Sequence, residues 1–126
     1  MKPLVLCIHM DRSRVSRLSF LAMGLGITVK DVPEDDLGQT LGALCGLDPR
    51  TENAPQAQVP EGMLVMAFFP DTLVDRWLDV LRTSGIGTVR IKAVLTPVNR
   101  TWNCGELYTV LNREMLAFAL REQLKP

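Results

Sequence analysis

The sequence has few of the residues that define specialised sites. Its three cysteines, Cys7, Cys45 and Cys104, are odd in number and far apart. This spacing excludes a disulfide framework and a zinc site of paired cysteines. A Gly-x-Gly pair occurs twice, but each pair follows a predicted helix, whereas anion binding needs glycines before a helix. We therefore expect reduced thiols, no metal and no cofactor.

The chain also lacks charge of one sign and any long hydrophobic run. Lys plus Arg and Asp plus Glu number 14 each, so the basic surface typical of nucleic-acid binding is not expected. The first apolar run stops at Asp11, which is too soon for a membrane span, and no signal-peptide cleavage site follows it. We expect a cytoplasmic protein without a nucleic-acid or membrane partner.

What the sequence does contain is enough apolar residues, 47% of 126, for one core. Residues 4–10 and 63–69 are continuous apolar stretches of strand length. Each precedes a helical pattern, a Gly-x-Gly break and an alternating stretch, at residues 27–30 and 88–92. The pattern predicts a single α/β domain over residues 1–126.

This domain is expected to consist of two β-α-β-α halves, at about residues 3–47 and 62–124. The first half is expected to end in a short helix between residues 33 and 45. The residues between the halves, 48–61, contain three prolines and no periodicity, which predicts a mobile connector. Aligning the halves 60 residues apart sets Asp11 on Asp71 and Leu18 on Leu78, which suggests internal duplication.

The two kinds of strand pattern predict the strand order. Continuous apolar strands are typical of the centre of a sheet, and alternating strands are typical of its edges. The predicted sheet is four-stranded and mostly parallel, in the order 2-1-3-4. Helices are expected on both faces, which agrees with central strands that are apolar on both sides.

The second half resembles a known family. Over about residues 63–118 it combines the apolar strand, a helix ending in Leu-Arg, the strand end Lys-Ala-Val-Leu-Thr-Pro-x-Asn, and Trp-x-x-x-Glu-Leu. These motifs resemble the bacterial family of domain of unknown function 3783. The resemblance implies a shared fold and no known activity. Where the family is expected to have a histidine after the Glu of the last helix, this chain has Glu114-Met115.

Residues 96–106 admit two interpretations. In the structural one, Asn103 caps the last helix, Glu106 completes a capping box, and Trp102 packs on Leu107. In the functional one, Asn99, Thr101 and Trp102 bind a ligand above the carboxyl ends of the first and third strands, together with His9 and Asp71.

Three functions remain open. The leading hypothesis is a non-enzymatic module that binds a small molecule or a protein in that crevice. A second is a thiol enzyme, because a cysteine at a helix start, here Cys104, can become a nucleophile when the helix dipole lowers its pKa. The third is a structural homo-oligomer that uses an edge strand.

Overall fold

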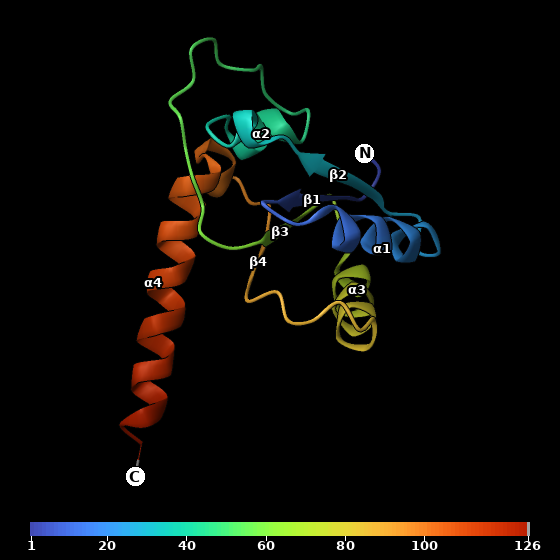
Figure 1. Ribbon diagram of the computed structural model, residues 1–126, viewed down its shortest axis with the longest axis vertical. Coiled ribbons are helices and arrows are strands. Elements are labelled where there is room, and N and C mark those ends of the chain that lie inside the picture. The colour runs from blue at the N-terminus through green and yellow to red at the C-terminus, as the bar shows by residue number, and fades with distance from the viewer. Residues whose placement is uncertain (126) are drawn as a thin grey trace.

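The computed structural model describes residues 1–125 and has a four-stranded sheet in the order β2-β1-β3-β4, as the sequence predicts. Figure 1 shows the helices on both faces of this sheet. The elements in chain order are β1 (Leu4–Ile8), α1 (Arg12–Met23), β2 (Thr28–Val32), η1 (Glu34–Asp36), α2 (Leu41–Leu44), β3 (Met63–Ala67), α3 (Asp71–Thr83), β4 (Ile91–Val94), η2 (Asn99–Thr101) and α4 (Cys104–Gln123).

The two central strands are apolar on both sides because each side packs against helices. Val5 and Cys7 of β1 face α1 and α3, where Leu18 and Trp77 are fully buried. Leu6 and Ile8 point to the other face and pack in the cluster that contains residues of α2 and the first turn of α4. The prediction that the continuous apolar strands are central is confirmed.

The prediction of a mostly parallel sheet needs correction, because the central pair is antiparallel. β1 runs parallel to β2, and β3 runs parallel to β4, but β1 and β3 run in opposite directions. A parallel β3 would require the chain to return across the sheet after β2. Instead it forms only short helical turns and the connector, and enters β3 at the end of the sheet where β1 and β2 finish. The sheet is therefore mixed.

The two halves correspond in structure at a spacing of 59 residues, not 60. β1 and β3 begin 59 residues apart, as do α1 and α3. A left-handed residue follows each strand, at His9 and Phe68, and a left-handed glycine follows each helix, at Gly26 and Gly85. The fully buried counterpart of Leu18 is thus Trp77 rather than Leu78.

The largest difference between the halves is the connection from helix to edge strand. Four residues, 24–27, separate α1 from β2, whereas seven, 84–90, separate α3 from β4. The alternation over residues 88–92 predicts a strand there, but β4 begins only at Ile91. Val89 is buried without being part of the sheet, so alternation in this loop reflects packing rather than strand pairing.

The connector, residues 48–61, contains no helix or strand, but it is tied to the body. Asp48 forms an ion pair with Arg100, and Thr51 exchanges two hydrogen bonds with the side chain of Gln39. Val59 is buried in the core. The short helix predicted between residues 33 and 45 is split into η1 and α2.

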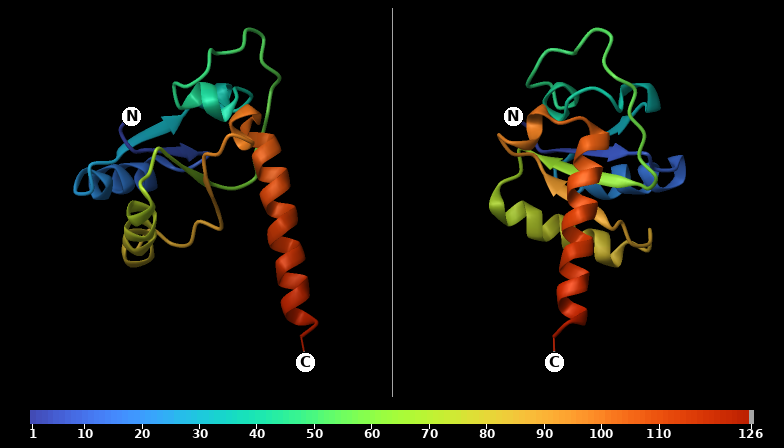
Figure 2. Two further views of the ribbon diagram at one scale, coloured as in Figure 1. Left: turned by 180° about the vertical axis from the view of Figure 1, so that it is seen from behind. Right: turned by 90° about the vertical axis from the view of Figure 1, so that its left-hand side faces the viewer.

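Helix α4 begins as predicted and then leaves the body. Asn103 accepts a hydrogen bond from the Glu106 amide, and the Glu106 carboxylate accepts one from the Asn103 amide, which confirms the capping box. Figure 2 shows that the carboxyl-terminal half of α4 projects beyond the sheet. Within residues 1–125, no helix is both long and apolar enough to cross a membrane.

Candidate ligand-binding site

The structure does not bring the residues of the expected crevice together. His9 follows β1 and Asp71 follows β3, and these antiparallel strands end at opposite ends of the sheet. The His9 side chain instead lies 2.7 Å from a carboxylate oxygen of Glu34. Asp71 is exposed in the first turn of α3. A single crevice above the carboxyl ends of β1 and β3 is absent from the part of the chain that the structure describes.

Asn99 has a structural role that accounts for its polar side chain. Its Oδ1 accepts the Thr96 amide at 2.8 Å, and its Nδ2 donates to the Val94 carbonyl at 3.0 Å. The Asn99 amide in turn donates to the Thr96 hydroxyl. Because Asn99 is buried and these bonds close the turn after β4, no ligand is needed to explain it.

The other two residues of this segment remain accessible. Thr101 is exposed, and its hydroxyl donates to the Val98 carbonyl. Trp102 is half-buried, packs against the cluster that contains Leu107, and lines a surface hollow of about 570 Å³ with connector residues such as Gln58. This hollow is the only one of the described cavities that includes a predicted ligand residue, and it contains neither His9 nor Asp71.

Cys104 lies at the start of α4, where the helix dipole would favour a thiolate, but burial has the larger effect. The residue is fully buried, and burial, with the nearby Cys45 and Glu34, raises the pKa of Cys104 to about 12. Its thiol is therefore protonated and inaccessible at neutral pH. The geometry gives the thiol-enzyme hypothesis no support.

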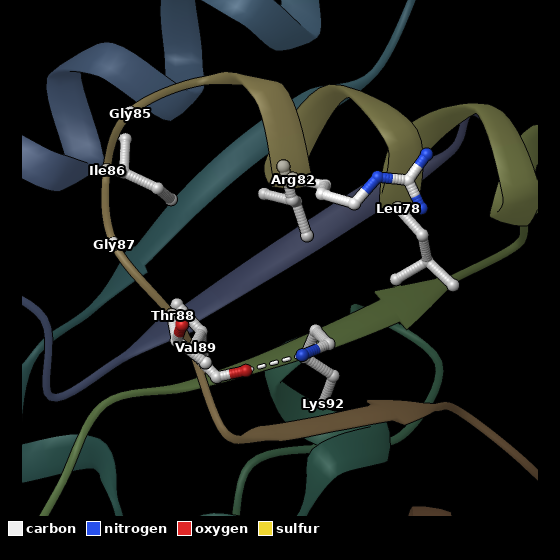
Figure 3. Close-up of a pocket in the computed structure, with 9 residues that line it drawn as sticks. Leu78, Arg82, Gly85, Ile86, Gly87, Thr88, Val89 and Lys92 are labelled. Atoms are coloured by element: carbon white, nitrogen blue, oxygen red, sulfur yellow. Dashed lines mark hydrogen bonds between the residues drawn. The ribbon is translucent and has the colours of Figure 1, made fainter.

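The largest described cavity lies elsewhere, between the end of α3, the loop 84–90 and β4, and has a volume of about 650 Å³. This volume is within the range of small-molecule sites. Figure 3 shows Leu78 and Arg82 of α3 on one side, the loop on the other, and Lys92 of β4 between them. The lining residues are Leu78, Leu81, Arg82, Gly85, Ile86, Gly87, Thr88, Val89 and Lys92.

The loop owes its shape to two glycines and one arginine. Gly85 and Gly87 have φ values of 78° and 86°, which residues with a Cβ rarely adopt. Arg90 then ties the end of the loop to the connector and to α4, because its guanidinium contacts the Glu61 carboxylate and the Asn112 side chain. The Glu61 carboxylate also accepts a hydrogen bond from Tyr108.

This ion pair changes the titration of Glu61. The hydrogen bond from Arg90 holds the pKa of Glu61 below its ordinary value, and the Tyr108 hydroxyl adds to the effect. Both charged side chains are about one-third exposed. The network therefore holds three segments together, namely the connector, the cavity loop and α4.

Lys92 is the cation in the wall of the cavity whose charge is not paired with a carboxylate of the described residues. Its ammonium donates to the Val89 carbonyl, and within residues 1–125 no carboxylate lies within ion-pair distance of it. Arg82, in contrast, is paired with Asp79 on the surface of α3. Within the same residues, no group of three or more side chains is arranged to hold a metal ion.

Sequence reasoning missed this cavity. The sequence predicts only a break after a helix at Gly85 and Gly87, but the same glycines also form part of the cavity wall. No local signal indicates the wider loop, because the alternation over residues 88–92 predicts a strand where the structure has a loop up to Arg90.

Comparison with known proteins agrees with the sequence motifs. Residues 62–118 match the model of the family described as Domain of unknown function (DUF3783). All the lining residues of the cavity fall inside the matched segment, as do Arg90, Tyr108 and Asn112, whereas Glu61 lies one residue before it. No curated protein and no solved structure matches the chain.

Proposed function

We propose that this protein is a non-enzymatic module that binds a small molecule with an apolar body and one anionic group. The binding site is the cavity between α3 and β4. The observation that carries this proposal is the position of Lys92, a cation without a carboxylate partner among the described residues, beside an apolar wall.

The two parts of the site suit the two parts of such a ligand. Leu78, Ile86 and Val89 offer apolar surface to the ligand body, and apolar burial gives roughly 25 cal/mol per Å² of contact. Lys92 offers an ammonium that now binds only a backbone carbonyl. An anion would form the stronger, charge-assisted hydrogen bond with this ammonium.

A cytoplasmic location and an origin by internal duplication complete the proposal. Free, buried thiols at Cys7, Cys45 and Cys104 suit a reducing compartment. The repeated order of strand, left-handed residue, helix and left-handed glycine supports duplication. The bacterial distribution that the family resemblance implies belongs to the same proposal.

The test uses decanoate and decanol, which share an apolar body and differ in charge. Isothermal titration of the whole chain should show decanoate binding more tightly than decanol. Lys92→Met keeps most of the apolar stem and should weaken decanoate about fivefold while leaving decanol unchanged. Lys2→Met, which changes an exposed lysine outside the cavity, is the matched control. Equal decanoate affinity in wild type and Lys92→Met would contradict the proposal.

A further inference from the structure

The loop 84–90, which Figure 3 shows along one side of the cavity, makes few hydrogen bonds of its own. The Ile86 amide donates to the Ser84 hydroxyl at 3.3 Å, but among the described residues the amides of Gly87 and Thr88 have no acceptor. Both Gly87 and Thr88 are also exposed. The position of the loop therefore depends on how its two ends are fixed.

The far end of the loop is attached to both faces of the sheet by two neighbouring residues. Val89 is buried in the cluster that contains residues of α1 and α3. Arg90 reaches instead toward α4, where its Nη2 lies 2.8 Å from Oδ1 of Asn112. Its Nε and Nη2 also donate to the two carboxylate oxygens of Glu61, a forked contact that a lysine cannot make. The guanidinium thus fixes the end of the loop to the connector and to α4 at once.

A second ion pair of the same kind shows what is particular to Arg90. Arg100 of η2 and Asp48 of the connector also form a forked contact, and their side chains are about one-third exposed, as are those of Arg90 and Glu61. Both pairs join the connector to the second half. Arg100 does not line the cavity, however, whereas Arg90 directly follows a residue of its wall. An effect on the ligand site is therefore expected of the Arg90 pair alone.

We propose that Arg90 is the positioning residue of the ligand site and makes ligand affinity depend on the connector and on α4. This inference rests on the proposed function, because it concerns the same cavity. Arg90 does not line the cavity and acts through Val89 and Ile86, which belong to its apolar wall. A loop that is already held in its binding position loses less conformational entropy when the ligand binds, so the ligand binds more tightly.

The first test compares decanoate with decanol by isothermal titration of the whole chain. Arg90→Met should weaken both ligands about fivefold, because both contact the apolar wall that Arg90 positions. Lys92→Met should weaken decanoate alone, so a positioning effect and a direct charge effect have different signatures. Arg100→Met removes the comparable ion pair outside the cavity and should leave both affinities unchanged. Equal affinity in wild type and Arg90→Met, loss of decanoate binding alone, or equal losses in Arg90→Met and Arg100→Met would overturn the proposal.

The contribution of α4 has a variant of its own. Asn112→Ala leaves the Glu61 contact in place and should weaken both ligands about twofold. This milder change also keeps the proposal testable if Arg90→Met fails to fold. Because coupling is reciprocal, decanoate should in turn shift the side-chain amide signal of Asn112, which does not line the cavity. Unchanged affinity in Asn112→Ala would overturn the role of α4.

A measurement without ligand separates this inference from the proposed function. The heteronuclear ¹H-¹⁵N Overhauser effect of the Gly87 amide should fall in Arg90→Met, because the released loop moves on the nanosecond timescale, and should stay unchanged in Arg100→Met. An unchanged value in Arg90→Met would overturn the inference and leave the proposed function intact. Failure of the wild-type protein to bind decanoate and decanol would instead contradict the proposed function, and the inference with it.

Discussion

The two halves of the molecule share the order of strand, helix and edge strand, but they differ in the connection from the helix to the edge strand. In the first half, α1 passes to β2 through four residues, and Ile27 of that connection is buried in the core, 5% exposed. In the second half, seven residues join α3 to β4, and Ile86, the counterpart of Ile27, lines the cavity instead. The shorter connection thus buries its isoleucine, whereas the longer connection leaves its isoleucine at the wall of a cavity.

The core between the sheet and the helices α1 and α3 contains residues of both halves, whereas the cavity, its lysine and Arg90 belong to the second half, and Glu61, the partner of Arg90, belongs to the connector. The network anchors this longer loop, because Arg90 at the end of the loop contacts Glu61 and Asn112. The loop that lines the cavity is therefore held in place although no side chain fills the cavity.

The largest expected effect concerns the two buried counterparts, Leu18 and Trp77. Trp77→Ala should lower the free energy of unfolding by about 4 kcal/mol and Leu18→Ala by about 3 kcal/mol, because the larger side chain leaves the larger space. Urea unfolding followed by circular dichroism measures both. If Leu18→Ala lowers the free energy of unfolding more than Trp77→Ala does, the two residues do not have corresponding roles in the core.

A smaller effect is expected at the start of α4. Asn103→Ala removes the cap that accepts the Glu106 amide and should cost about 1 kcal/mol. Glu106→Ala should add little to the Asn103→Ala change, because the two side chains form one capping box. Thermal unfolding of the two single variants and the double variant tests this. Additive losses would show that the two bonds act independently.

The ion pair of the second half should make stability depend on pH. The pKa of Glu61 in the folded protein lies below its ordinary 4.5, so the pair stabilises the fold above about pH 4.5 and loses this effect as the pH falls through the folded-state value. The melting temperatures of wild type and Glu61→Gln should converge as the pH falls below this value. Glu52→Gln, at an exposed connector residue, is the control. A difference that stays constant down to pH 3 would contradict the role of the pair.

The smallest effect is expected at the thiols. Burial raises the pKa of Cys7 and Cys104 to about 12 and that of Cys45 to about 11. Ellman's reagent should therefore react with none of them in the folded protein, and with all three at one rate once urea unfolds it. Rapid labelling of Cys104 alone would revive the hypothesis of a thiol enzyme.

The sequence predicts strand order because burial leaves a pattern in it. The apolar runs around Val5 and Val65 correctly predicted the centre of the sheet, and the capping chemistry of Asn103 and Glu106 correctly predicted the start of α4. Both depend on residues that are neighbours in sequence or share one environment.

Strand direction and the cavity leave no such pattern. Nothing in an apolar strand records which way its neighbour runs, so the antiparallel pairing of β1 with β3 was missed, and with it the separation of His9 from Asp71. The cavity depends on how Arg90 meets Glu61, 29 residues away, and local periodicity does not report such a contact.

The central claim is that the longer connection of the second half is a ligand site while its counterpart in the first half is closed. The most direct measurement is a titration of ¹⁵N-labelled protein with decanoate, followed through glycine amides. We predict that the amides of Gly85 and Gly87 shift progressively and saturate, while those of Gly24 and Gly26 stay in place. Equal shifts in both pairs, or none in Gly85 and Gly87, would contradict the account.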